Sequence, residues 1–167
     1  MRVLLDTSVL VAAMVEAHPA HTQALPRLQR VKDGTDTGLV AAHSVAELYA
    51  VLTTLPVHPR ISPVIAQQLI RSNVLDVFEV VSLSDEDYAA VVDRLSALGI
   101  IGGATYDALI LQAASKANVD QIVTHVLFRG QTHAEKAASG FRGNFPAFYR
   151  ESQAKSGIDF LEMNRAK

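Results

Sequence analysis

The chain has 167 residues, of which 49% are hydrophobic and 19% charged, and its formal net charge is −2. A chain of this length can bury a full hydrophobic core as one domain. It contains no cysteine, which excludes disulfides, thiolate zinc sites and cysteine nucleophiles. The apolar run near the N-terminus is broken by Asp6 and is too short and polar for a signal peptide or a membrane span, so we expect a cytoplasmic protein with no membrane partner.

The expected elements alternate between short apolar strands and longer helices. Val3 to Leu5 predicts a buried strand that stops at Asp6, and a helix begins at Thr7. Further strands are expected at 39–42, 77–83 and 121–124, and further helices at 19–32 with a break near Pro26, 44–55, 62–73, 84–99 and 105–117. Because parallel strands need crossover connections, which are helical, this alternation predicts an α/β fold with a parallel sheet.

The charge is distributed unevenly along the chain. Residues 1–125 hold 13 acidic and 8 basic side chains, a net charge of −5, whereas residues 126–167 hold 4 acidic and 7 basic ones, a net charge of +3. The second segment also contains glycines and a proline without a sustained hydrophobic period. We therefore predict a domain at 1–125 and an atypical basic C-terminal tail at 126–167 that is irregular or weakly ordered.

Three acidic residues are expected at one edge of the sheet. Asp6 ends the first strand, Glu47 lies in the first turn after the second, and Asp107 lies in the first turn of the helix before the fourth. Ligands of open parallel sheets bind at the carboxyl ends of the strands. Each acid also has a structural interpretation: Asp6 as a helix cap, Glu47 in a capping box with Ser44, and Asp107 beside a helix dipole.

Taken together, the three acids favour a metal site over three separate caps. Asp6 and Asp107 stand next to apolar runs, where an ionised carboxylate is costly unless it is paired or bound to metal. Two carboxylates about 4 Å apart repel by roughly 1 to 4 kcal/mol near a protein surface. A cluster of three therefore needs divalent cations, and oxygen ligands select Mg²⁺ or Mn²⁺.

Three sequence motifs around these acids resemble a known family. V-L-L-D-T-S-V-L, S-V-A-E-L-Y and I-G-G-A-T-Y-D-A-L-I-L-Q-A-A together are similar to a PIN domain, and most like the VapC toxins of bacterial toxin–antitoxin pairs. The resemblance covers about residues 1–125. It implies a three-layer α/β/α fold with a small parallel sheet, and a metal-dependent endoribonuclease that acts on RNA. It also implies a cognate antitoxin as partner and a homodimer.

The resemblance also assigns roles to individual residues. Asp6, Glu47 and Asp107 match the acids that hold the metal and carry catalysis in the family. Thr7 or Ser8 matches the hydroxyl that supports the first acid. In the implied reaction, one metal ion activates water for in-line attack on an RNA phosphodiester, and the same ion or a second one stabilises the departing oxygen.

The chain departs from the family pattern after the fourth strand. Family members usually carry a T-x-[DN] element there, whereas Thr124 and His125 are followed by Val126, which offers no oxygen ligand. Thr124 is expected to support the site. His125 is a candidate contact for metal or phosphate, although a lone histidine at a strand end is more often a surface or hydrogen-bonding residue.

Several alternatives stay open at this point. A PIN-like module with weak or no catalysis, acting through protein or RNA binding, fits the missing fourth ligand. A phosphatase-like enzyme with Asp6 as nucleophile is disfavoured, because position 8 is serine rather than a second aspartate. The apolar helix positions within 43–71 predict either core or a partner surface. The change of character after residue 125 fits either a shifted reading frame or ordinary divergence.

Overall fold

The computed structural model describes residues 1–126 and 159–164, with side chains up to residue 124. The described elements, in chain order, are β1 (Arg2–Leu5), α1 (Thr7–Met14), α2 (His21–Lys32), β2 (Thr37–Ala41), α3 (Ala42–Thr54), α4 (Pro63–Ile70), the π-helical turn η1 (Arg71–Leu75), β3 (Glu79–Val81), α5 (Asp85–Ala97), α6 (Ala104–Lys116), β4 (Gln121–Val126) and β5 (Asp159–Asn164).

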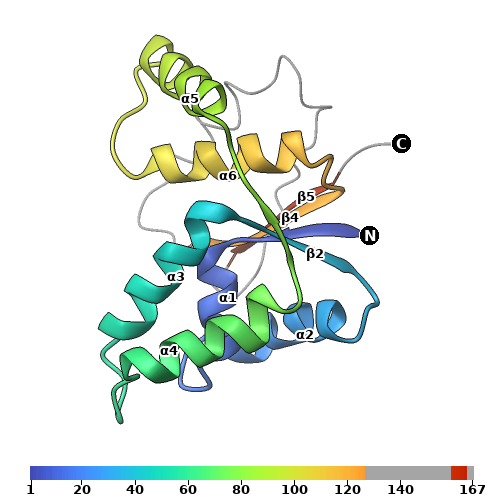
Figure 1. The fold of residues 1–167 in the computed structure, drawn as a ribbon, viewed down its shortest axis with the longest axis vertical. Helices are drawn as coiled ribbons and strands as arrows, with labels where there is room; N and C mark the ends of the chain where they lie inside the picture. Colours follow the sequence, from blue (N-terminus) through green and yellow to red (C-terminus); the bar gives the residue numbers. More distant parts are fainter. Residues whose placement is uncertain (127–158, 165–167) are drawn as a thin grey trace.

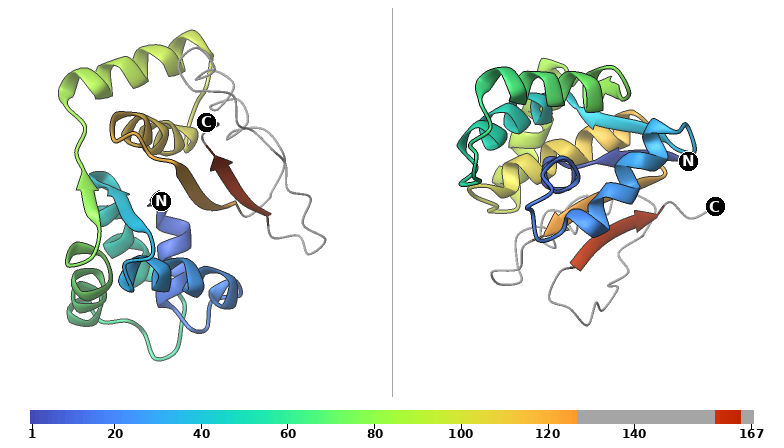
Figure 2. Two further views of the ribbon diagram at one scale, coloured as in Figure 1. Left: turned by 90° about the vertical axis from the view of Figure 1, so that its right-hand side faces the viewer. Right: turned by 90° about the horizontal axis from the view of Figure 1, so that it is seen from below.

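The strands form one sheet in the order β3-β2-β1-β4-β5. The strands β3, β2, β1 and β4 run parallel to one another, and Leu4 in the central strand β1 pairs with Leu39 of β2 and Ile122 of β4. The strand β5 runs antiparallel to β4 at one edge of the sheet (Figure 2). The carboxyl ends of β1, β2 and β4 therefore meet at a single edge, as predicted for a parallel α/β sheet.

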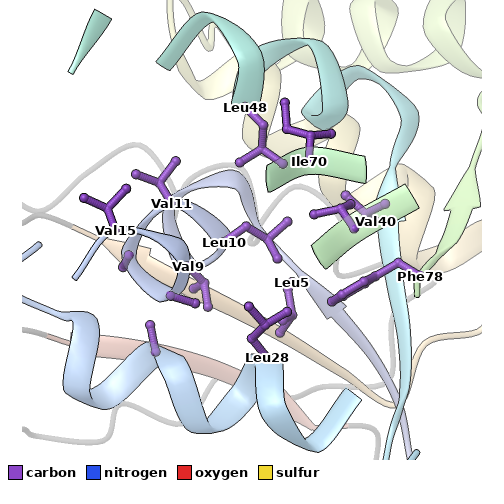
Figure 3. Close-up of a cluster of buried hydrophobic side chains, with 14 of the residues drawn as sticks. Leu5, Val9, Leu10, Val11, Val15, Leu28, Val40, Leu48, Ile70 and Phe78 are labelled. Carbon is purple, nitrogen blue, oxygen red and sulfur yellow. The ribbon is translucent and has the colours of Figure 1, made fainter. Parts of the chain in front are cut away.

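Helices cover both faces of the sheet and give three layers (Figure 1). Alternate residues of a strand point to opposite faces, so Val3 and Leu5 join one core and Leu4 joins the other. The larger core packs α1, α2, α3 and α4 against the sheet, and Leu5, Leu10, Leu28 and Leu48 belong to it (Figure 3). The second core lies under α5 and α6. The predicted three-layer α/β/α fold is confirmed.

Two expectations about helices prove wrong. The helix α2 runs without a break from His21 to Lys32, with Pro26 inside it. Proline removes one backbone donor, and the burial of Ala24, Leu28 and Val31 against the core offsets that loss. The helix expected to reach residue 73 is regular only to Ile70 and continues as the π-helical turn η1.

Two expectations about strands also change. The strand expected at 77–83 is shorter, covering only Glu79–Val81, and its first two residues are exposed because it lies at the edge of the sheet. The segment 126–167, expected to be irregular, contains the strand β5 at Asp159–Asn164. Pairing with the free edge of β4 supplies the hydrogen bonds that local sequence does not indicate. The rest of the tail, 127–158 and 165–167, lies outside the described residues.

In the part of the chain that the structure describes, no helix is long and apolar enough to cross a lipid bilayer.

Candidate active site

Asp6 lies where β1 passes into α1, at the carboxyl edge of the sheet. Its backbone N–H donates to the carbonyl of Val123 in β4, at 3.0 Å, which fixes it beside the neighbouring strand. Its side chain makes no cap hydrogen bond to α1. Instead, its Oδ2 accepts hydrogen bonds from Ser8 Oγ at 2.9 Å and Thr124 Oγ1 at 2.7 Å. Asp6 is thus the N-cap residue of α1, as the sequence allows, but its side chain does not cap the helix.

Glu47 joins the same edge through a hydroxyl of α1. Its Oε2 accepts a hydrogen bond from Thr7 Oγ1 at 2.7 Å, and Thr7 is only 5% exposed. The alternative capping box with Ser44 is wrong. The helix α3 begins two residues earlier than expected, at Ala42, so Ser44 is a buried residue inside it and Glu47 lies in its second turn.

The two hydroxyl residues after Asp6 thus serve different acids. Ser8 supports Asp6, whereas Thr7 reaches across to Glu47. Thr124 is the second hydroxyl on Asp6, the position at which the sequence predicts support. Each of these bonds joins a hydroxyl to a carboxylate, a strong type of hydrogen bond that fixes the carboxylate's orientation.

Asp107 lies in the first turn of α6 and is partly buried. The preceding residue, Tyr106, contacts His43 of α3, with their ring centroids 6.5 Å apart. This contact brings the start of α6 beside the start of α3, the helix that carries Glu47. All three predicted acids therefore lie on elements that meet at the carboxyl edge of the sheet.

His43 is a partly buried histidine at this edge. Its Nε2 has no hydrogen-bond partner among the described residues. Burial lowers the pKa of His43, and the nearby negative charges of Glu47 and Asp6 oppose that shift. Burial therefore outweighs the two carboxylates, and the net shift of the pKa favours the neutral imidazole.

The donor atoms at this edge suit a hard divalent cation. Carboxylate and hydroxyl oxygens are ligands that Mg²⁺ and Mn²⁺ prefer, and no thiolate is present in the chain. Within residues 1–124, whose side chains are described, no three His, Asp or Glu side chains lie close enough together to enclose a metal ion. The acids Asp6, Glu47 and Asp107 thus share the edge without forming a closed ligand set, and they fit the ion by their chemistry.

The departure from the family pattern lies at the end of β4. The backbone of His125 and Val126 extends this strand two residues beyond the predicted 121–124, and it pairs with Phe160 and Asp159 of β5. The side chains of His125 and Val126 lie outside the described part of the chain, so a contact of His125 with metal or phosphate stays a prediction.

The sequence interpretation did not single out His43 or Tyr106. Both lie close in sequence to a predicted acid. His43 is four residues, or one helical turn, before Glu47, and Tyr106 directly precedes Asp107. Residues four apart on a helix share a face. That spacing is the signal that identifies His43, whereas Tyr106 becomes recognisable only from its exposure and its contact.

Comparison with known proteins decides the family. The family model described as "PIN domain" matches residues 3–125. The chain belongs to the PIN domain family. The matched range contains Asp6, Glu47 and Asp107 together with the hydroxyl residues that bond to them.

Relatives of this PIN domain protein include two ribonucleases of Mycobacterium tuberculosis. Ribonuclease VapC40 is 38% identical over 109 residues, which is 63% of this chain and 72% of the relative. Ribonuclease VapC27 of strain H37Rv is 31% identical over 111 residues, 66% of this chain and 75% of the relative. Both relatives are named as ribonucleases.

Two solved structures share the PIN fold. VapC20 of M. tuberculosis, described as a sarcin–ricin loop cleaving toxin, aligns with a TM-score of 0.56 and 17% identity over 71% of this chain and 85% of its own. VapBC2 of Rickettsia felis, solved with a DNA fragment from its promoter, aligns with a TM-score of 0.52 and 21% identity over 76% of this chain and 89% of its own. At this identity the likeness shows the fold.

Proposed function

We propose that this PIN domain protein is a divalent-metal-dependent endoribonuclease, the toxin of a toxin–antitoxin pair that acts in the cytoplasm. The observation that carries the proposal is the hydroxyl-bonded arrangement of Asp6 and Glu47 at the edge where α6 presents Asp107. Support also comes from the relatives named VapC40 and VapC27, which are called ribonucleases.

Asp6, Glu47 and Asp107 would hold Mg²⁺ or Mn²⁺. When bound, such an ion activates water for attack on the phosphodiester and stabilises the leaving oxygen. Hydroxyl groups of the chain fix the orientation of the carboxylates: Ser8 and Thr124 donate hydrogen bonds to Asp6, and Thr7 donates one to Glu47. Loss of a hydrogen-bond partner of a metal ligand typically lowers metal affinity or activity by about 10- to 100-fold.

An antitoxin partner and a homodimer are part of the same proposal. A partner segment with basic side chains suits the acidic edge, because opposite charges steer association. Of the apolar positions within 43–71, Leu48 and Leu52 are fully buried in the core, which leaves the partner surface to other residues. The exposed apolar side chains on the adjacent helices α3 and α4 suit a protein partner, namely Tyr49, Val64 and Ile65.

A second candidate is a PIN-like module that binds partners without cutting RNA. Val126 favours it, because valine stands where an oxygen ligand is usual in the family. The two candidates differ in one measurable property, which is hydrolysis of RNA in the presence of a divalent cation.

The deciding experiment is cleavage of structured RNA by the purified protein with Mn²⁺, Mg²⁺ or EDTA. We expect cleavage with the cations, none with EDTA, and loss of cleavage in Asp6→Asn. The exposed acid Asp93 lies on α5, in the layer of α5 and α6, and gives the matched control Asp93→Asn, which keeps activity. Cleavage that survives EDTA, or that Asp6→Asn leaves unchanged, contradicts the proposal, and no cleavage under any condition favours the binding module.

A further inference from the structure

Tyr106 presents an aromatic ring to solvent beside the candidate active site. Its side chain is 57% exposed, although it lies in the first turn of α6 directly before the partly buried Asp107. The core of α6 is formed by other residues, among them Ala108, Leu109 and Leu111, so the ring is not needed to fill it. An exposed ring at this place is therefore available to a ligand.

His43 supports this ring from the neighbouring helix. The two rings lie 6.5 Å apart and are tilted by 37°, within the range of favourable aromatic contacts. The backbone of α3 holds His43 one turn before Glu47, and its Nε2 is buried without a partner in the described part of the chain. His43 thus ties the orientation of the Tyr106 ring to the helix that carries Glu47.

The electrostatics of the edge favour a contact that does not depend on charge. Phosphate groups are repelled by Asp6, Glu47 and Asp107 wherever cations do not neutralise them. Three basic side chains donate hydrogen bonds to partners within the chain: Arg30 to Asp36, Lys32 to Asn73 and Lys116 to Asp87. Stacking of a base on an aromatic ring supplies affinity without charge and tolerates any base.

Building on the proposed ribonuclease function, we propose that Tyr106 is the stacking platform for an unpaired RNA base next to the cleaved phosphate, with His43 as its positioning residue. The proposal concerns substrate binding and positioning, and it assigns neither residue a role in bond cleavage. It rests on the exposure of Tyr106, its contact with His43 and its place directly before Asp107.

The sequence allows a direct optical test, because the chain contains no tryptophan. Tyr106→Trp introduces a single reporter whose fluorescence is quenched when a base stacks on it. Tyr88→Trp is the matched control, since Tyr88 is 40% exposed and lies on α5. Both are made in an Asp6→Asn background, so that the single-stranded RNA probe survives titration with Mg²⁺ present.

We expect RNA to quench the Tyr106→Trp reporter strongly and the Tyr88→Trp control little. In the same background, Tyr106→Ala should weaken RNA binding by about 5- to 150-fold, whereas Tyr106→Phe keeps the affinity. In the active protein, Tyr106→Ala should raise KM with little change in kcat. His43→Ala should reduce the quenching of the Tyr106→Trp reporter, a change that a purely structural role would not produce.

Equal quenching of both reporters overturns the proposal. The proposal is also overturned if Tyr106→Ala leaves the RNA affinity unchanged. It is equally overturned if Tyr106→Ala lowers the melting temperature but does not weaken RNA binding by the folded protein. The outcome is separable from that of the proposed function. A wild-type protein that cleaves RNA while Tyr106→Ala leaves KM unchanged refutes only the stacking, whereas quenching without any cleavage by the wild type refutes only the nuclease.

Discussion

The carboxylate of Asp6 accepts hydrogen bonds from two hydroxyls that lie far apart in sequence. Ser8 is two residues away, whereas Thr124 is 118 residues away on the adjacent strand β4. Glu47 is bonded in the same manner to Thr7, 40 residues earlier. The orientation of each acid therefore depends on the assembled sheet, and a single hydroxyl can be removed to test its contribution.

Thr124→Val removes one donor to Asp6 and preserves the shape of the side chain. We expect Mn²⁺ affinity and RNA cleavage to fall by about 10- to 100-fold, as when partners of metal ligands are lost. The free energy of unfolding should change by less than about 1 kcal/mol, because Asp6 is only partly buried and water can replace the lost donor.

The control is Thr124→Ser, which keeps the hydroxyl and should retain activity near that of the wild type. Thr124→Val with full activity would show that the 2.7 Å hydrogen bond to Asp6 does not orient the site.

At the residue scale, the sequence predicted the positions of the acids at the sheet edge better than it predicted their hydrogen bonds. Asp6 was predictable because an apolar strand ends at it. The S-x-x-E pattern of Ser44 and Glu47 is typical of a capping box, whereas the box in the structure joins Ser84 and Asp87. The two patterns look alike in sequence, and only the start of α3 at Ala42 separates them.

At the scale of elements, the packing of α2 on the sheet requires a glycine in β2. A Cβ on Gly38 would lie 2.3 Å from Val31 Cγ1 and 2.7 Å from the ring of Phe78. Val31 belongs to α2 and Phe78 precedes β3, and both are buried. Any side chain at position 38 therefore pushes the helix or the ring away from the sheet.

Gly38→Ala is expected to lower the free energy of unfolding by about 1–3 kcal/mol, the usual cost of overpacking a core. Gly103→Ala is the control, because a Cβ there meets nothing within 4 Å and its φ is −61°. It should be neutral or slightly stabilising. Chemical denaturation of both variants checks this, and equal stability of the two would show that α2 moves away without cost.

Asp87 links the two helices of the other layer. It closes the capping box of α5 with Ser84 and accepts hydrogen bonds from Gln112 and Lys116 of α6. The hydrogen bond from Lys116, followed by those from Ser84 and Gln112, holds the pKa of Asp87 well below its ordinary value of 3.8. The ionised form is thus favoured by folding.

This lowered pKa predicts a loss of stability in acid. A carboxyl with a depressed pKa stabilises the fold above its ordinary value, and the contribution disappears as the pH falls below 3.8 toward the folded pKa. The free energy of unfolding of the wild type should therefore decrease in this range more steeply than that of Asp87→Asn. Lys116→Met should flatten the profile in the same direction. Parallel profiles for all three proteins would exclude the contribution.

The elements themselves were largely predictable, and their ends were not. The four parallel strands follow from apolar runs, whereas β5 pairs with β4 through backbone groups that carry no sequence signal. The short β3 is an edge strand, so its flanking apolar residues do not continue the ladder. The break expected at Pro26 is absent from α2, because tertiary packing offset the low helix propensity of proline.

At the scale of the whole molecule, the sheet divides the protein into two cores and gathers the acids at one edge. The acidic excess of residues 1–125 includes Asp6, Glu47 and Asp107, which would bind cations at that edge. The family match ends at residue 125, where the basic segment begins. The separation of 126–167 as a tail stays a prediction, since only its strand β5 is described after residue 126.

We propose that Asp6, Glu47 and Asp107, three acids from distant segments, form one cation site. This proposal is tested most directly by the melting temperature with and without Mn²⁺ for the wild type, Asp6→Asn, Glu47→Gln and Asp107→Asn. An ion at about 100 times its dissociation constant adds about 2.7 kcal/mol, which raises the melting temperature of the wild type by about 5–10 °C. We predict that each substitution abolishes most of this rise while Asp93→Asn preserves it. An unchanged wild-type melt, or a full rise in all three variants, would contradict the account.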